Sequence, residues 1–196
     1  QPDNPEYSCA VKKRLPMLTR AELLGQIMRN YDTPIAVAGT HGKTTTTSMI
    51  SHILLESDCD PTISVGGILP VIGGNIRVGN SETFVTEACE YTNSFLSFFP
   101  KISLILNIDA DHLDFFKDIE DIRHSFRLFA EKLPADGTLI INSDTDKYTE
   151  IIRDLPCEII TYGLNSNADY TAQNIQYNEY GYATFDCVKD GVNLGT

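Results

Sequence analysis

Residues 35–47 read Ile-Ala-Val-Ala-Gly-Thr-His-Gly-Lys-Thr-Thr-Thr-Thr. The apolar residues at the start predict a strand, and the residues after the second glycine begin a helical pattern. Gly39 and Gly42 allow the backbone between them to turn so that its N–H groups point inward, and the positive end of the following helix attracts an anion. This order predicts a phosphate-binding loop, in which Lys43 reaches the terminal phosphates and the hydroxyl of Thr44 binds Mg²⁺.

The loop is not a complete Walker motif, because the pattern G-x-x-x-x-G-K-[ST] requires glycine where this chain has Val37. The alternative interpretation is an ordinary glycine-rich turn between a strand and a helix, with a surface lysine. The order of strand, two glycines, Lys-Thr and helix favours the phosphate loop. The predicted phosphate-binding set therefore also includes Thr40, His41 and Thr45.

Apolar runs alternate with helical patterns along most of the chain. This alternation predicts an α/β fold with a doubly wound, mostly parallel sheet. Two segments near the C-terminus alternate polar and apolar residues and predict a small antiparallel β appendage. We expect strands over 35–38, 62–65, 83–86, 102–108, 138–142 and 158–162, helices over 19–30, 43–57, 119–133 and 144–155, and the antiparallel pair over 170–177 and 182–188.

Local signals predict where some helices begin and which face they bury. Thr19, followed three residues later by Glu22, forms a capping box that predicts a helix start. Asp144 is the expected cap of the last helix. The expected apolar face of the helix after the loop consists of Met49, Ile50, Ile53 and Leu54.

Size and charge bound the class of protein. The 196 residues are 42% hydrophobic, which is enough for one well-cored domain. A net charge of −12 argues against a nucleic-acid partner. No apolar run approaches the roughly 20 residues that a membrane span needs. The five cysteines are dispersed without a C-x-x-C pair, which is typical of the reduced thiols of a cytoplasmic protein.

Polar clusters follow three of the predicted strands, at 39–44, 87–90 and 107–114. In an open α/β sheet the ligand lies beyond the carboxyl ends of the strands. We therefore expect the three clusters to face the same crevice.

The clusters contain candidate metal ligands. Mg²⁺ prefers hard oxygen atoms, so the hydroxyl of Thr44 and one of Glu87 or Glu90 are natural candidates. His112 is the candidate for an imidazole ligand or an acid–base group. The alternatives are a solvated strand end for Glu87 and a capping or core histidine for His112.

The stretch 66–80 contains five glycines in fifteen residues. This composition predicts a mobile loop whose backbone closely approaches another group. Asn75 and Arg77 are weak candidates for contacts with anionic or sugar groups of a substrate. The alternative is a plain flexible connector.

Three motifs together carry a family resemblance. They are Gly-Thr-His-Gly-Lys-Thr-Thr-Thr at 39–46, Thr-Glu-Ala-Cys-Glu at 86–90 with Ser-Phe-Leu at 94–96, and Asn-Ile-Asp-Ala-Asp-His-Leu-Asp at 107–114. In order and spacing they resemble the Mur ligase family, and His41 is most similar to the branch that joins L-alanine to UDP-N-acetylmuramate. The resemblance implies an ATP-dependent ligase of peptidoglycan precursor synthesis.

The resemblance also implies a domain organisation with three domains. Residues 1–18 are polar, contain proline and lack periodic apolar positions, so they are expected to be a linker or the tail of a preceding, UDP-sugar-binding domain. Residues 19–196 are expected to be a truncated central ATP-binding domain, with the C-terminal domain absent. Such a piece is expected to be inactive as a ligase by itself.

Residue roles are implied by the resemblance. Lys43 is expected to contact the β- and γ-phosphates, Thr44 to bind a first Mg²⁺, and Glu87 and His112 to bind a second. Asn107 is expected near the sugar-linked carboxylate. The family activates that carboxylate as an acyl phosphate, which an amine then attacks. Two cations suit this chemistry because carboxylate and γ-phosphate are both anions.

Two other functions stay open. A sibling Mur- or folate-type amide ligase is one, but several siblings use a carbamylated lysine downstream of the histidine, where this chain has Arg123 and Arg127. A non-catalytic P-loop nucleotide-binding module is the other, and it would not need Glu87 or His112. A switch-type GTPase is disfavoured because no Asn-Lys-x-Asp motif is present.

Overall fold

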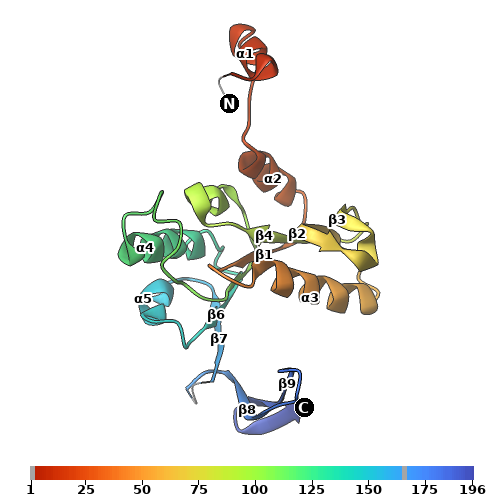
Figure 1. The fold of residues 1–196 in the computed structure, drawn as a ribbon, viewed down its shortest axis with the longest axis vertical. Helices are drawn as coiled ribbons and strands as arrows, with labels where there is room; N and C mark the ends of the chain where they lie inside the picture. Colours follow the sequence, from red (N-terminus) through yellow and green to blue (C-terminus); the bar gives the residue numbers. More distant parts are fainter. Residues whose placement is uncertain (1–2, 165–166) are drawn as a thin grey trace.

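In the residues that the computed structural model describes, 3–164 and 167–196, ten strands form one sheet (Figure 1). Their order across the sheet is β10-β9-β8-β7-β6-β5-β1-β4-β2-β3. The strands are β1 (Thr33–Ala38), β2 (Thr62–Leu69), β3 (Gly74–Arg77), β4 (Thr83–Ala88), β5 (Ile102–Ile105), β6 (Thr138–Asn142), β7 (Glu158–Gly163), β8 (Tyr170–Tyr177), β9 (Ala183–Lys189) and β10 (Val192–Gly195).

The sheet is mostly parallel, which confirms the predicted fold class. From β2 across β4, β1, β5, β6 and β7 to β8, every neighbouring pair is parallel. Strand β3 on one edge, and β9 and β10 on the other, are antiparallel to their neighbours. The predicted C-terminal hairpin is confirmed, and it continues the main sheet because Tyr162 pairs with Tyr170.

Helices cover both faces of the sheet. The α-helices are α1 (Pro5–Lys12), α2 (Arg20–Met28), α3 (Lys43–Glu56), α4 (Ile119–Ala130) and α5 (Tyr148–Ile152), and two 3₁₀ segments are η1 (Pro70–Ile72) and η2 (Tyr91–Ser97). Ala36 and Ala38 of β1 belong to the core formed with α2, η2, α4 and α5. Side chains alternate along a strand, so the intervening Val37 faces the other side, where α3 packs on β1, β2 and β4. None of the described helices has both the length and the apolar character required to cross a membrane.

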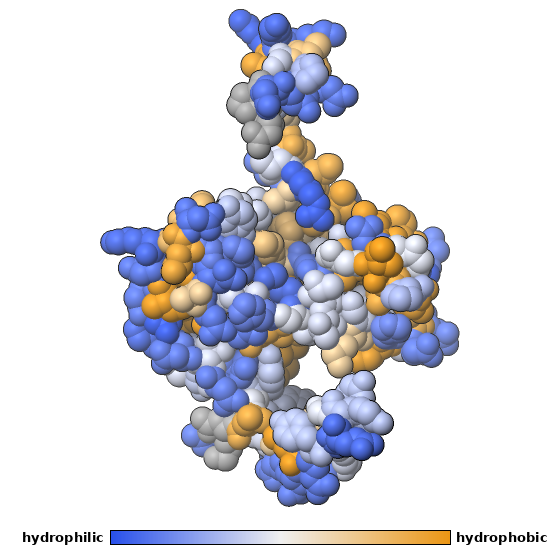
Figure 2. All heavy atoms as spheres, viewed as in Figure 1, coloured by the Kyte–Doolittle hydropathy of each residue, from blue (hydrophilic) through white to orange (hydrophobic). Residues whose placement is uncertain are grey.

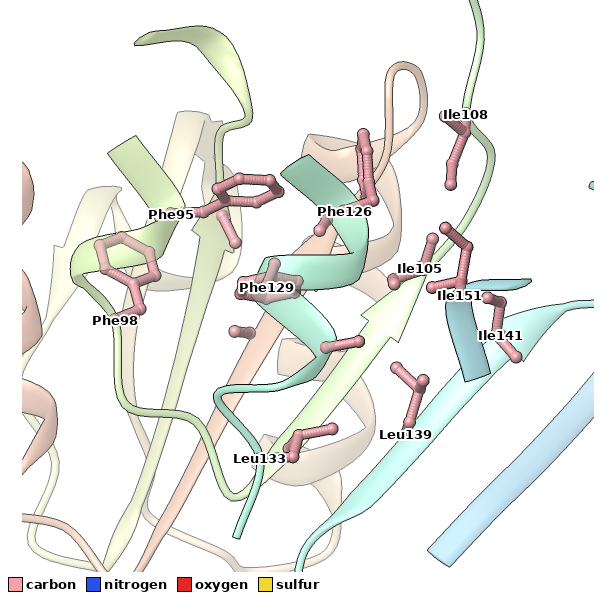
Figure 3. Packing of buried hydrophobic residues seen from close by; sticks show 14 of the residues in the cluster. Phe95, Phe98, Ile105, Ile108, Phe126, Phe129, Leu133, Leu139, Ile141 and Ile151 are labelled. Atoms are coloured by element: carbon pink, nitrogen blue, oxygen red, sulfur yellow. The ribbon is translucent and has the colours of Figure 1, made fainter. Parts of the chain in front are cut away.

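Aromatic rings fill the core between the sheet and α4 (Figure 3). Phe95 of η2 stacks on Phe129 with ring centroids 4.6 Å apart, and meets the edge of Phe126 at 5.4 Å. Ile122, Phe126 and Phe129 lie at helical spacing on α4 and are all buried, as is Leu133 just after the helix. The same core contains Ile108 from the segment that follows β5, so this segment packs with α4.

The N-terminal segment contains a helix that the sequence did not predict. Helix α1 begins after Asn4, whose side chain accepts hydrogen bonds from the backbone N–H groups of Glu6 and Tyr7. None of its residues is buried, and it lies apart from the rest of the molecule in Figure 1. Capping and a proline in the first turn therefore form this helix without packing. Residues 1 and 2 of the expected linker lie outside the described residues.

The stretch 66–80 is a hairpin, and the expectation of a mobile loop is wrong. Strand β2 continues through Gly66 to Leu69, and the chain returns antiparallel as β3 after η1. The expected close approach is confirmed, because a Cβ atom at Gly66 would lie 2.8 Å from a carboxylate oxygen of Glu87. Gly66 and Gly79 therefore allow close packing at this edge of the sheet, whereas a Cβ atom at Gly73 or Gly74 would have open space around it.

Two helix predictions also need correction. The last helix begins only at Tyr148, because the Asp144 carboxylate accepts a hydrogen bond from the N–H of Leu164 and Lys147 adopts a left-handed conformation. On α3, Met49 and Ile53 are 62% and 68% exposed. Small side chains, Thr47 and Ser51, instead face the sheet and let the helix lie close to it. Figure 2 shows apolar side chains gathered near the β2–β3 edge.

Candidate active site

The loop between β1 and α3 adopts the predicted strand–loop–helix arrangement. Gly39 and Gly42 have φ angles of +146° and +83°, in the region that side chains rarely occupy. A Cβ atom at Gly39 would also lie 3.0 Å from the Cβ of Leu106. Both glycines are therefore needed for this backbone path.

The N-terminus of α3 offers backbone donors to an anion. Helices α2 and α4 are capped by the side chains of Thr19 and Asp118, and both carry acidic residues in the first turn. Helix α3 has neither, and its first N–H groups, from Lys43 to Thr45, have no partner from a capping side chain. These donors and the helix dipole together favour a bound phosphate.

The segment after β5 holds the loop in shape. The Oδ1 of Asn107 accepts a hydrogen bond from the N–H of His41 at 2.8 Å, and its Nδ2 donates to the carbonyl of the same residue at 3.0 Å. The hydroxyl of Thr40 accepts from the N–H of Asp109 at 2.9 Å. The amide of Asn107 is thus used to fix the loop, a role that the sequence did not predict, since the residue was expected at the substrate carboxylate.

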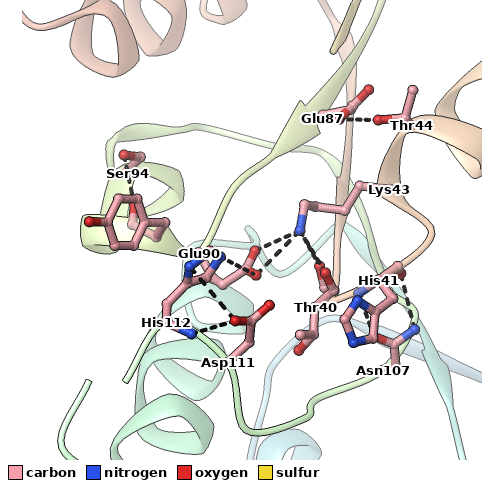
Figure 4. A network of polar contacts seen from close by, with 12 residues as sticks. Thr40, His41, Lys43, Thr44, Glu87, Glu90, Ser94, Asn107, Asp111 and His112 are labelled. Carbon is pink, nitrogen blue, oxygen red and sulfur yellow. Dashed lines mark hydrogen bonds and ion pairs between the residues drawn. The ribbon is translucent and has the colours of Figure 1, made fainter. Parts of the chain in front are cut away.

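The Lys43 ammonium group lies over the loop (Figure 4). Its Nζ donates to the carbonyls of Gly39 and Thr40 at 2.6 and 3.1 Å. It also lies 3.0 and 3.3 Å from the two carboxylate oxygens of Glu90, a residue that is only 2% exposed. The sequence suggested Glu90 only as an alternative metal ligand and gave no signal that it pairs with Lys43.

Thr44 and Glu87 form a pair of hard oxygen atoms beside the loop. The Thr44 hydroxyl donates to the Glu87 Oε2 at 3.0 Å, and the N–H of Gly66 donates to Oε1. Adjacent ligands of an octahedral Mg²⁺ lie about 3 Å apart, because each Mg–O bond is about 2.1 Å and adjacent bonds are perpendicular. The side chains present therefore fit this cation, with the remaining positions left to phosphate oxygens and water.

His112 lies at the other end of the polar network in Figure 4. Its Nε2 is 3.8 Å from the Oε1 of Glu90, and its ring lies 4.6 Å from that of Tyr91. The backbone of His112 has φ +53°, an uncommon conformation for a residue with a side chain. The Tyr91 hydroxyl donates to Asp114 at 2.8 Å, and this hydrogen bond raises the pKa of Tyr91.

The structure does not bring Arg77 to this site. Arg77 pairs with Ile63 near the amino end of β2, whereas the loop follows the carboxyl end of β1. The two therefore lie at opposite ends of the parallel strands. Its guanidinium contacts Asp60 and the Pro61 carbonyl, and it lowers the pKa of the Asp60 carboxyl. Arg77 therefore lies apart from the predicted phosphate loop, and its expected substrate contact stays a prediction. Asn75 is exposed on β3, and its expected substrate contact also stays a prediction.

In the described part of the chain, no three His, Cys, Asp or Glu side chains form a ready-made metal cluster. Arg123 pairs with Glu120 and Asp146. The neighbouring Arg127 pairs with Glu131. Both arginines thus act in surface ion-pair networks on α4.

Comparison with known sequences places the chain in a family. Residues 37–194 match the Mur ligase middle domain. The UDP-N-acetylmuramate–L-alanine ligases of Lachnospira eligens and Agathobacter rectalis are 61% and 62% identical to it over 100% and 97% of the chain. These matches cover 43% and 42% of the two relatives, so the chain spans about two fifths of their length.

Solved structures agree with the sequence match. UDP-N-acetylmuramate-alanine ligase from Thermotoga maritima has a TM-score of 0.81 at 26% identity, over 98% of this chain and 43% of that one. A UDP-N-acetylmuramate:L-alanyl-γ-D-glutamyl-meso-diaminopimelate ligase from Neisseria meningitidis shares the fold, with a TM-score of 0.83 at 23% identity over 95% of this chain and 61% of that one. The chain belongs to the Mur ligase family.

Proposed function

We propose that the chain carries the ATP site of a ligase that joins L-alanine to UDP-N-acetylmuramate. Relatives named for this reaction are 61–62% identical to it, although they are more than twice as long. The observation that carries the proposal is the uncapped N-terminus of α3 with the Lys43 ammonium held over the loop. Residues 19–196 then correspond to the central ATP-binding domain. The five free cysteines agree with a cytoplasmic location.

The loop would hold the ATP phosphates through the backbone N–H groups from Lys43 to Thr45, with the Lys43 ammonium on the terminal phosphates. The Thr44 hydroxyl and the Glu87 carboxylate would hold Mg²⁺, which supplies positive charge between the reacting anions. His112, whose Nε2 lies 3.8 Å from Glu90, would take part in a second cation position at the other end of the network. Asn107 keeps the loop rigid, so that little ordering is needed when the nucleotide arrives.

A cavity of ≈ 580 Å³ lies beside Glu87 and is lined by the start of α2 and by η2. Arg20, Tyr91 and Ser94 are among its lining residues. We assign this cavity to the carboxylate-bearing substrate, because a cation, hydroxyl groups and the candidate Mg²⁺ site meet there. The carboxylate would then face the terminal phosphate, as acyl-phosphate formation requires.

The test is a calorimetric titration of a non-hydrolysable ATP analogue with Mg²⁺ into the chain. Lys43→Ala should weaken binding about 100-fold or more, because it removes a charged hydrogen bond in a partly buried site. Lys117→Ala removes an exposed lysine and should bind like wild type. Equal affinity in all three proteins, each shown to be folded, would contradict the phosphate loop. Amide formation from UDP-N-acetylmuramate and L-alanine would then be assayed on the longer protein.

A non-catalytic nucleotide-binding module is the rival that the same titration addresses. Such a module has no use for a second cation position, so His112→Ala would leave its affinity for the Mg²⁺ nucleotide unchanged. The hydrogen bond between Thr44 and Glu87 favours the ligase, because it joins the loop to a carboxylate on the neighbouring strand.

A further inference from the structure

Glu90 is the most buried charged side chain in the site, and the mechanism above does not use it. It follows β4 and is 2% exposed. Both of its carboxylate oxygens lie within 3.3 Å of the Lys43 Nζ, and one lies 3.8 Å from the His112 Nε2. Glu90 therefore stands between the phosphate loop and the His112 end of the site.

The pair fixes the position of the Lys43 ammonium group. An ammonium has three protons to donate, and the carbonyls of Gly39 and Thr40 together with Glu90 accept them. A buried carboxylate is costly unless a cation compensates it, so Glu90 also needs Lys43. In the absence of ligand, each charge is thus held by the other.

Binding of a phosphate changes this balance. A phosphate oxygen that replaces one of the two carbonyls as the acceptor of an Nζ proton lies about 3 Å from Nζ. Because the Glu90 oxygens lie 3.0 and 3.3 Å from the same nitrogen, the two anions come within about 6 Å of each other. At an effective dielectric constant of about 20, two such charges repel enough to lower an affinity about 100-fold. Glu87, which accepts a hydrogen bond from the Thr44 hydroxyl, adds the negative charge of a second carboxylate beside the loop.

We propose that Glu90 is a positioning residue that holds Lys43 over the phosphate loop and makes nucleotide binding depend on a divalent cation. Lys43 alone cannot offset both Glu90 and the phosphates. A cation beside Thr44 and Glu87 supplies the missing positive charge. The proposal rests on the proposed function, because it assumes that the loop binds a nucleotide.

The experiment measures the dissociation constant of a non-hydrolysable ATP analogue with Mg²⁺ and with EDTA, in wild type and Glu90→Gln. Glutamine keeps the shape and one oxygen that accepts from Lys43, but it removes the charge. Wild type should lose about 100-fold or more in affinity when Mg²⁺ is removed, and Glu90→Gln about 10-fold or less. Glu82→Gln removes a carboxylate from the far end of β4 and should behave as wild type. A purely structural role would change both constants together and leave their ratio unaltered.

Equal ratios in wild type and Glu90→Gln would overturn the role of Glu90 and leave the nucleotide site standing. No binding to wild type in either condition would instead overturn the proposed nucleotide site. If Glu90→Gln does not fold, thermal unfolding of Lys43→Met and of Lys43→Met/Glu90→Gln decides. The double variant should unfold at the higher temperature, because the single variant leaves a buried charge without a partner. An unfolding temperature of the single variant equal to or above that of the double would refute the pairing.

Discussion

Replacing Asn107 by alanine tests how the shape of the phosphate loop affects nucleotide binding, because the substitution leaves all charges of the site unchanged. The substitution removes two hydrogen bonds, of 2.8 and 3.0 Å, to the backbone of His41. His41 is exposed, so water can replace these bonds, and we expect a loss of stability of about 1–3 kcal/mol. Freeing one loop residue costs about 1–2 kcal/mol when a ligand must order it again, so nucleotide affinity should fall about 5–30-fold.

Chemical denaturation measures the first effect, and calorimetric titration of the Mg²⁺ nucleotide analogue measures the second. Asn80→Ala is the matched control, because the Asn80 amide donates a hydrogen bond to the Asp60 carboxylate at the amino ends of β2 and β4, away from the phosphate loop. It should lose some stability and keep the affinity of wild type. If Asn107→Ala binds the nucleotide as tightly as wild type, the loop does not depend on Asn107 for its shape and the reasoning fails.

Two further substitutions test packing near the site. Gly66→Ala would place a Cβ 2.8 Å from the Glu87 carboxylate, so the Thr44–Glu87 contact should break and Mg²⁺-dependent nucleotide affinity should fall about 10-fold by titration. Gly74→Ala is the control, because no atom lies within 4 Å of its new Cβ, and it should bind the nucleotide like wild type. If Gly66→Ala binds the nucleotide as tightly as Gly74→Ala, the prediction is contradicted. Thr47→Val removes a buried hydroxyl that has no hydrogen-bond partner among the described residues. It should raise the free energy of unfolding in denaturation by about 1–2 kcal/mol, and a loss of stability would show that the hydroxyl is satisfied.

The sequence predicted those parts of the fold that local signals determine. The capping box of Thr19 and Glu22 is present, and the start and end of α3 lie within one residue of the expected positions. The parallel order followed from the alternation of strands and helices. The β2–β3 hairpin was missed because its pairing depends on contacts between strands. Glycine composition alone does not distinguish a mobile loop from a packed edge.

The site residues illustrate the same division. The phosphate loop and the hydroxyl–carboxylate pair of Thr44 and Glu87 could be proposed from order and chemistry. The contact between Asn107 and His41 joins residues 66 positions apart, and the pair of Lys43 and Glu90 joins residues 47 positions apart. Such contacts depend on the register between strands, which a single sequence does not contain. The sequence also did not show that Arg77 lies away from the loop, because the direction of β3 decides at which end of the strands Arg77 lies.

The position of β1 in the sheet explains why the loop can be rigid without a complete glycine motif. Strand β1 lies between β4 and β5, so the segments that follow both neighbours end beside the loop. Asn107 reaches the loop from the β5 side, and Glu90 holds Lys43 from the β4 side. The two contacts act on different properties, since one fixes the backbone of His41 and the other fixes the position of the Lys43 ammonium group. Effects of Asn107→Ala and Glu90→Gln on nucleotide affinity in the presence of Mg²⁺ should therefore add, and strong coupling between them would show that backbone shape and lysine position are one property.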